Sequence, residues 1–131
     1  MMDLVHNIGI VSMIVPSSNA TTVTGISIDL SGFESAVVAI QVAGVAADET
    51  LVVKLQDSNT DSNYVDVVVD NTNILGDVPT YAPGCGASVN KFGYIGGKKY
   101  IKLIATIGGT TPAIILGAIC VKGDARRKPI A

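Results

Sequence analysis

Residues 93–107 read GYIGGKKYIKLIATI, and this stretch decides the fold class. It begins with a glycine-rich turn and continues into a segment of strict two-residue alternation. Four apolar side chains share one face of that segment: Ile101, Leu103, Ala105 and Ile107. The intervening residues share the other face: Tyr100, Lys102, Ile104 and Thr106. Because side chains alternate across a β-strand, this pattern predicts a core strand with its first face buried. No residue type in the stretch indicates catalysis.

The same kind of pattern recurs along the chain, and no segment shows a helical stripe. Apolar runs separated by turn residues predict three single strands: one over 8–15 that Pro16 stops, a half-buried one over 26–30, and one over 36–44 that is buried on both faces. They also predict two hairpins. The first pairs 51–56 with 65–70 around 57–63, and the second pairs 99–107 with 113–122 across 108–112. We therefore expect an all-β protein, a single antiparallel β-sandwich of jelly-roll-like order. An immunoglobulin-like order is the alternative, since periodicity does not encode strand order.

A length of 131 residues suits one domain, residues 1–131, with extended termini at 1–7 and 123–131. Residues 71–97 are rich in glycine and proline and predict a long loop, which is uncommon in a compact domain unless it works at a surface. The loop holds three of the six aromatic residues: Tyr81, Phe92 and Tyr94. They are candidate partner-binding anchors; the other interpretation is that they plug one end of the sandwich.

Composition favours an assembly over a free monomer. Apolar residues make up 48% of the chain and charged residues only 15%, against about 25% in ordinary soluble domains. The net charge is −2, but ten of the eleven acids precede Lys91 and eight of the nine strong bases lie from Lys91 onward. The chain therefore has apolar surface to cover, and a basic part that suits acidic neighbours.

Residue types that carry chemistry are sparse. His6 is the sole histidine, and Cys85 and Cys120 form no CxxC pair, so neither a zinc set nor a nucleophile and base pair is evident. We expect no enzymatic activity and no cofactor. The spacing of Asp57, Asn59 and Asp61 matches the start of a calcium loop, but the rest of that motif is missing. These three are weak metal candidates, and a plain hairpin loop explains them better.

Basic residues near the C-terminus are the remaining candidates for partner binding: Lys98, Lys99, Arg126, Arg127 and Lys128. A pI near 5.1 and the lack of aromatics after Tyr100 argue against direct nucleic-acid binding, so we expect a protein partner. The N-terminal apolar run has no basic residue before it and is short, and the run over 113–121 is far below a membrane span. Synthesis in the cytoplasm, without membrane insertion, is the expectation.

Residues 94–107, followed by the Gly-Thr-Thr-Pro turn and a second apolar strand, resemble a segment of small proteins of tailed double-stranded DNA bacteriophages. There the segment has a Tyr-x-Gly-Gly-Lys-Arg-Tyr pattern and is preceded by a Leu-Gln-Asp-Ser-like hairpin, here residues 55–58. The resemblance covers about residues 50–123. The phage proteins concerned are similar to capsid decoration proteins, also called cement proteins. Lys99 stands where that pattern has Arg, which weakens any bidentate contact there.

The resemblance implies a compact β-sandwich on the capsid surface of a virion, made in the cytoplasm of a bacterial host. Its partners would be the major capsid protein and further copies of itself, as a dimer or trimer. Binding across capsid subunits would stabilise the head, since many copies multiply weak contacts. A phage tail or head-tail joining protein is one alternative. A carbohydrate-binding module is another, although the chain has no tryptophan for a sugar-stacking platform.

Overall fold

A computed structural model of the chain describes residues 8–67, 73–109 and 112–125, without the side chains at positions 34, 124 and 125. Within these ranges the chain forms strands and no helix, so nothing there is a helix long and apolar enough to cross a membrane. The strands are β1 (Gly9–Asn19), β2 (Val23–Thr24), β3 (Ile28–Asp29), β4 (Phe33–Val42), β5 (Glu49–Ser58), β6 (Val65–Asp66), β7 (Ile74–Leu75), β8 (Thr80–Tyr81), β9 (Ser88–Tyr94), β10 (Tyr100–Gly109) and β11 (Ile114–Ala125).

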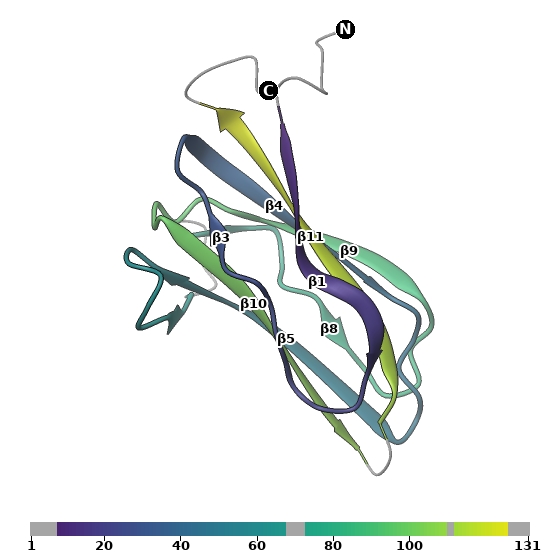
Figure 1. The fold of residues 1–131 in the computed structure, drawn as a ribbon. Coiled ribbons are helices and arrows are strands. Elements are labelled where there is room, and N and C mark those ends of the chain that lie inside the picture. The colour runs from purple at the N-terminus through teal and green to yellow at the C-terminus, as the bar shows by residue number, and fades with distance from the viewer. Residues whose placement is uncertain (1–7, 68–72, 110–111, 126–131) are drawn as a thin grey trace, which may run out of the picture.

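The strands form two antiparallel sheets that pack face to face (Figure 1). One sheet has five strands in the order β1-β11-β4-β9-β7. The second has the order β2-β10-β5-β6, with β3 also pairing with β10 and β8 with β5. The expected all-β antiparallel sandwich is confirmed.

Strand order decides between the two expected topologies. Pairing is nested from the chain ends inward: β1 with β11, β2 and β3 with β10, β4 with β9, and β5 with the short strands β6 and β8. An immunoglobulin-like sandwich pairs its first strand with its second, whereas here the first strand pairs with the last. The nested order is that of a jelly roll, a double-sheet design that viral capsid proteins and lectins share.

The core lies between the sheets and its centre is β10. Ile101, Leu103 and Ala105 are fully buried and Ile107 nearly so, as the alternation predicts. β10 pairs with β5 over ten residues, and the inward side chains of β5 are buried as well: Leu51, Val53 and Leu55. Burying a side chain of this size contributes about 1.5–3 kcal/mol, so these two strands supply much of the stability.

The predicted hairpin of 99–107 with 113–122 is wrong. β10 and β11 belong to different sheets: β10 pairs with β5, and β11 lies between β1 and β4. Both segments bury one apolar face, and alternation alone does not tell a hairpin partner from a strand in the facing sheet. The hairpin of β5 with β6 is confirmed, through Gln56 opposite Asp66, but β6 is only two residues long and residues 68–70 of the predicted strand lie outside the described ranges.

Proline does not stop the first strand as predicted. β1 continues through Pro16 to Asn19, with irregular register on both sides of Ile14. β1 is an edge strand, so a missing backbone N–H is tolerated there. The irregularity also frees the Met13 carbonyl, which accepts a hydrogen bond from the Ile26 N–H at 2.8 Å and ties β1 to the β2–β3 connection.

Three other predictions need correction. β4 buries only one face, because Val37 is 38% exposed and Gln41 is exposed, so 36–44 is not buried on both sides. In the segment 26–30, Ile26 is exposed while Ile28 and Leu30 are buried. Residues 123–125 belong to β11 and pair with the start of β4. They are therefore strand and not an extended terminus.

Residues 71–97 are not one long loop either. They contain β7, β8 and the seven-residue β9, which pairs with β4. The inward positions of β9 are Ser88, Asn90, Phe92 and Tyr94, so half of its buried face is polar. Because Ser88 and Asn90 are polar, the sequence of β9 lacks the alternation of apolar and polar residues from which a strand is predicted.

Candidate interaction surfaces

The glycine-rich turn before β10 is built around the Tyr94 side chain. Tyr94 is 2% exposed, and its hydroxyl donates to the Asp57 carboxylate at 2.8 Å and accepts the Lys98 backbone N–H at 3.1 Å. Gly96 lies against the ring: a Cβ there would come within 2.7 Å of the ring carbons. Gly97 has φ near +79°, a left-handed conformation that favours glycine. Burial, with the Asp57 hydrogen bond, raises the pKa of Tyr94 well above its ordinary value.

The aromatic residues proposed as partner anchors are buried in this fold. Phe92 and Tyr94 are each 2% exposed and Tyr81 is 8% exposed, all within the core. The Tyr81 hydroxyl is also occupied, because it donates to the Asn90 side chain at 3.2 Å. These side chains plug the sandwich and present almost no surface to a partner, so the anchor hypothesis is wrong for them.

The lysines that follow the turn are exposed and form part of a basic end of the sandwich, which we define as Lys98, Lys99 and Lys122. A pocket of about 170 Å³ lies beside Lys98 and Lys99, between the turn and the start of β4. Lys122 extends over the Phe33 ring at 4.8 Å and approaches the Asp29 carbonyl oxygen at 3.4 Å.

One acid lies among these bases. Hydrogen bonds from Ser31 hold the pKa of Asp29 below its ordinary value, and the charges of Lys99 and Lys122 lower it further. Arg126, Arg127 and Lys128, the other proposed basic contacts, lie outside the described residues, as does His6.

The carboxylates of the calcium-like loop, residues 57–61, accept hydrogen bonds from tyrosine hydroxyls. Asp57 accepts from Tyr94, and Asp61 accepts from the Tyr64 hydroxyl. Tyr64 and Ser27 hydrogen bonds lower the pKa of Asp61, while burial and the Asp61 bond raise the pKa of Tyr64 to about 12. Asp61 and Asn63 adopt φ values near +55°, as Asx residues do in tight turns. Among the described residues no group of three or more His, Cys, Asp or Glu side chains gathers as a metal site.

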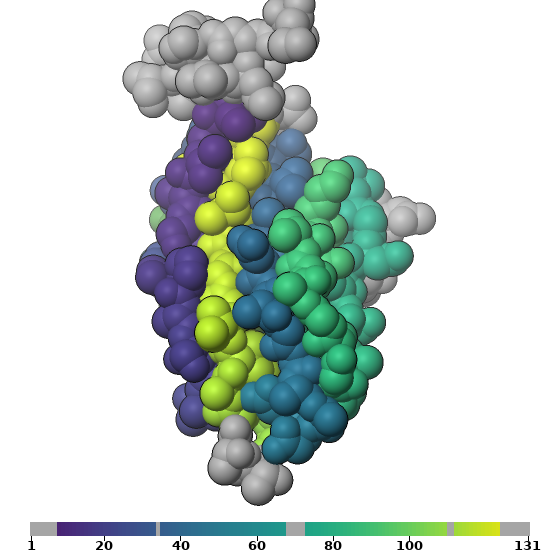
Figure 2. All heavy atoms as spheres, turned by 90° about the vertical axis from the view of Figure 1, so that its right-hand side faces the viewer, coloured from purple at the N-terminus to yellow at the C-terminus, as the bar shows by residue number. Residues whose placement is uncertain are grey.

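One surface feature that the sequence interpretation missed is the outer face of the five-stranded sheet. Figure 2 looks onto it, with β1 in purple, β11 in yellow, β4 in blue and β9 in green lying side by side. Register places one row across all five strands and two shorter rows beside it. The rows are Ile10–Val121–Val37–Gly93–Leu75, Ser12–Ile119–Ala39–Lys91 and Gly117–Gln41–Val89, with Ile115 beyond them. We call these residues the apolar face.

The apolar face exposes large aliphatic side chains to solvent. Val89 is 67% exposed, Ile10 61% and Ile115 52%. A groove of about 900 Å³ runs over β1, β11, β4 and β9. Its floor includes Gly117, which is covered by the Pro16 ring and has no room for a Cβ. The signal in the sequence was present: β4 and β11 are apolar at both odd and even positions.

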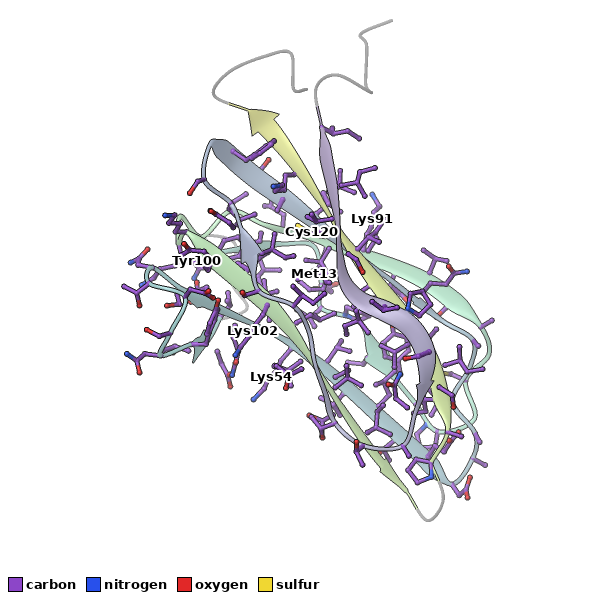
Figure 3. All side chains as sticks on the ribbon, viewed as in Figure 1. Met13, Lys54, Lys91, Tyr100, Lys102 and Cys120 are labelled. Atoms are coloured by element: carbon purple, nitrogen blue, oxygen red, sulfur yellow. The ribbon has the colours of Figure 1, made fainter. Side chains whose placement is uncertain are left out.

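The outer face of the second sheet differs in character. Lys54 and Lys102 extend from it, as Figure 3 shows, and Lys54 pairs with Asp66 at 3.3 Å. Lys102 lies over the Tyr64 ring at 4.1 Å, and Gln56 donates to Asp66 at 2.8 Å. Charged and polar groups therefore share this side with exposed valine such as Val52, and the two outer faces of the sandwich differ in composition.

A scan against known protein families finds no match, and neither does a search of curated protein sequences. Among solved structures, the chain is similar to an SPBc2 prophage-derived protein, YomS. The TM-score is 0.50 at 8% sequence identity, and the match covers 88% of this chain and 93% of the other. At that identity the likeness concerns the fold, which the two proteins share over nearly their whole lengths.

Proposed function

We propose that this chain is a structural protein of a tailed phage particle that decorates the capsid and stabilises it by binding across major capsid protein subunits. The observation that carries the proposal is the apolar face, because the largest contiguous apolar patch on a protein is often an interaction site. The phage-type sequence pattern around residues 94–107 and the prophage origin of the structural neighbour support the phage assignment.

The molecule offers two chemically distinct contact surfaces, the apolar face and the basic end. The apolar face suits contacts that exclude water. The basic end suits an acidic patch on the capsid exterior, where exposed charges steer binding and set its specificity. In this arrangement Lys98 and Lys99 contact the major capsid protein, and self-association supplies the valency that makes many weak contacts hold.

A carbohydrate-binding role gains no support from the aromatic residues. All six lie within the described ranges, and none has the open exposure that a sugar-stacking platform requires. The three that remain outside the deepest core, Phe33, Tyr64 and Tyr100, are each covered on one side by a lysine.

The test uses phage heads assembled with and without the protein. We expect heads that carry it to withstand higher temperature and chelator than bare heads. The double variant Lys98→Gln/Lys99→Gln should bind heads weakly, and its deficit should shrink at high salt because screening weakens the contacts of the unmodified protein. Lys54→Gln, which removes a lysine from the outer face of the second sheet and outside the basic end, is the matched control. Equal resistance of decorated and bare heads would refute the stabilising role.

A further inference from the structure

We infer that the apolar face is a dimer interface, packed against the same face of a second copy of this chain. The inference rests on the surface of the isolated protein and not on the proposed function. The pure chain therefore tests it without any phage component.

The size of the face meets what a stable pair requires. Four neighbouring strands about 4.8 Å apart, each contributing about eight residues at ~3.4 Å, present roughly 500 Å² of flat area. Protruding side chains raise the accessible surface above that value. Two such faces bury more than about 1,000 Å², which is the minimum that a specific protein–protein interface needs.

The charge pattern favours a copy of the same face over a charged partner. Lys91 is the only charged side chain in the described rows of the apolar face. It is exposed, and its long aliphatic stem allows the ammonium to reach water at the rim. Two copies therefore meet without burying an unpaired charge, which would cost far more than the apolar contact gains. An acidic partner would find almost nothing to pair with.

Relief on the face allows two copies to interlock. Small residues such as Ala39 and Ala43 line the groove together with the larger and more exposed Ile115, Ile119 and Val89. Under a two-fold axis each copy places its projecting side chains in the groove of the other, as an isologous interface requires. Sheets that pack in this way keep their strands within about 30° of each other and leave a layer about 10 Å thick.

The edges of the same sheet disfavour the main rival mode of self-association, in which edge strands pair. At one edge β1 has Pro16 and two irregularities of register, and at the other β7 has only two residues. Prolines, bulges and short strands are the devices that block edge pairing. With the edges protected and the face open, a second copy docks face to face.

The experiment measures mass in solution by sedimentation equilibrium over a wide range of concentrations. The unmodified chain should weigh twice its 13.4 kDa and dissociate on dilution. Val89→Lys and Ile119→Lys should each raise the dissociation constant by about 100-fold, since each dimer carries the substitution twice. Val52→Lys is the matched control: Val52 is a strand valine with 62% exposure, close to the 67% of Val89, but on the other sheet. It should leave the dimer intact.

A second measurement needs no variant and so does not depend on how a variant folds. Hydroxyl-radical footprinting of the unmodified chain should show oxidation of Ile115, Ile119 and Val89 falling as concentration rises, with Val52 unchanged. A chain that stays monomeric at 100 µM, on the order of a weak interface's dissociation constant, would overturn the inference. So would a dimer that Val89→Lys and Ile119→Lys leave unaffected, or one that protects Val52 instead. Failure of head stabilisation, by contrast, would leave this dimer standing.

Discussion

Removing one oxygen from Tyr94 tests how the glycine-rich turn is held. In Tyr94→Phe the ring still fills its site, but the Asp57 carboxylate loses a donor and the Lys98 N–H loses an acceptor. A buried partner left unpaired costs about 1–3 kcal/mol, and a bond to a carboxylate lies at the upper end. Asp57 is only half-buried and Lys98 is exposed, so water replaces part of what is lost. We expect the free energy of unfolding to fall by about 2 kcal/mol.

The assay is urea unfolding, with a thermal melt as a second readout. For a chain of this length a loss of about 2 kcal/mol corresponds to roughly 6–10 °C in Tm. Tyr100→Phe is the matched control, because its hydroxyl makes no hydrogen bond among the described residues, and it should change the free energy by under ~0.5 kcal/mol. If Tyr94→Phe proves as mild as Tyr100→Phe, the hydroxyl does not hold the turn and our explanation of the stretch 93–100 fails.

Three further predictions concern other sites. Gly96→Ala should lower the free energy of unfolding by about 1–3 kcal/mol in the same urea assay, because the added methyl meets the Tyr94 ring. Gly76→Ala is the control: its Cβ would have open space, so only the strain of the left-handed φ remains, about 1 kcal/mol. Glu49 is buried, and hydrogen bonds from the Ala113 and Ala46 amides lower its pKa from the ordinary 4.5. Its contribution is therefore fully present above that value and lost as pH falls through the lower folded pKa, so Glu49→Gln should flatten the acid limb of a stability–pH curve; an unchanged limb would contradict this. Burial raises the pKa of Cys120 to about 11, so a thiol reagent at pH 8 should label Cys85 well before Cys120, and equal labelling rates in the folded protein would argue against a buried Cys120.

The core strands could be read from the sequence because their burial is one-sided and apolar. Ile101, Leu103 and Ala105 alternate without interruption, and so do Leu51, Val53 and Leu55 facing them. Partner choice was harder to read. β10 and β11 are adjacent in sequence and each buries one apolar face, yet they lie in different sheets, since a short connection can also join two facing sheets. β9 was missed because Ser88 and Asn90 stand on its inner side.

The candidate surfaces follow the same logic. Exposed lysines of the turn could be located from sequence, because charged side chains seldom enter a core. The aromatics of residues 81–94 were misassigned, since an aromatic side chain suits a core and an interface equally well and only the fold distinguishes them. The apolar residues at outward positions of β4 and β11 could be read from the sequence, but their assembly into one face could not. It exists only once register aligns Ile10, Val121 and Val37 with residues from two further strands.

The most direct test of the proposed function is the copy number of this chain in purified phage particles, measured by quantitative mass spectrometry against the major capsid protein. A decoration protein should be present in a number comparable to that of the capsid subunits, and should be lost together with head stability when it is stripped. A copy number of ring size would contradict capsid decoration and indicate a tail or head-tail joining component, and absence from the particle would contradict a virion role altogether.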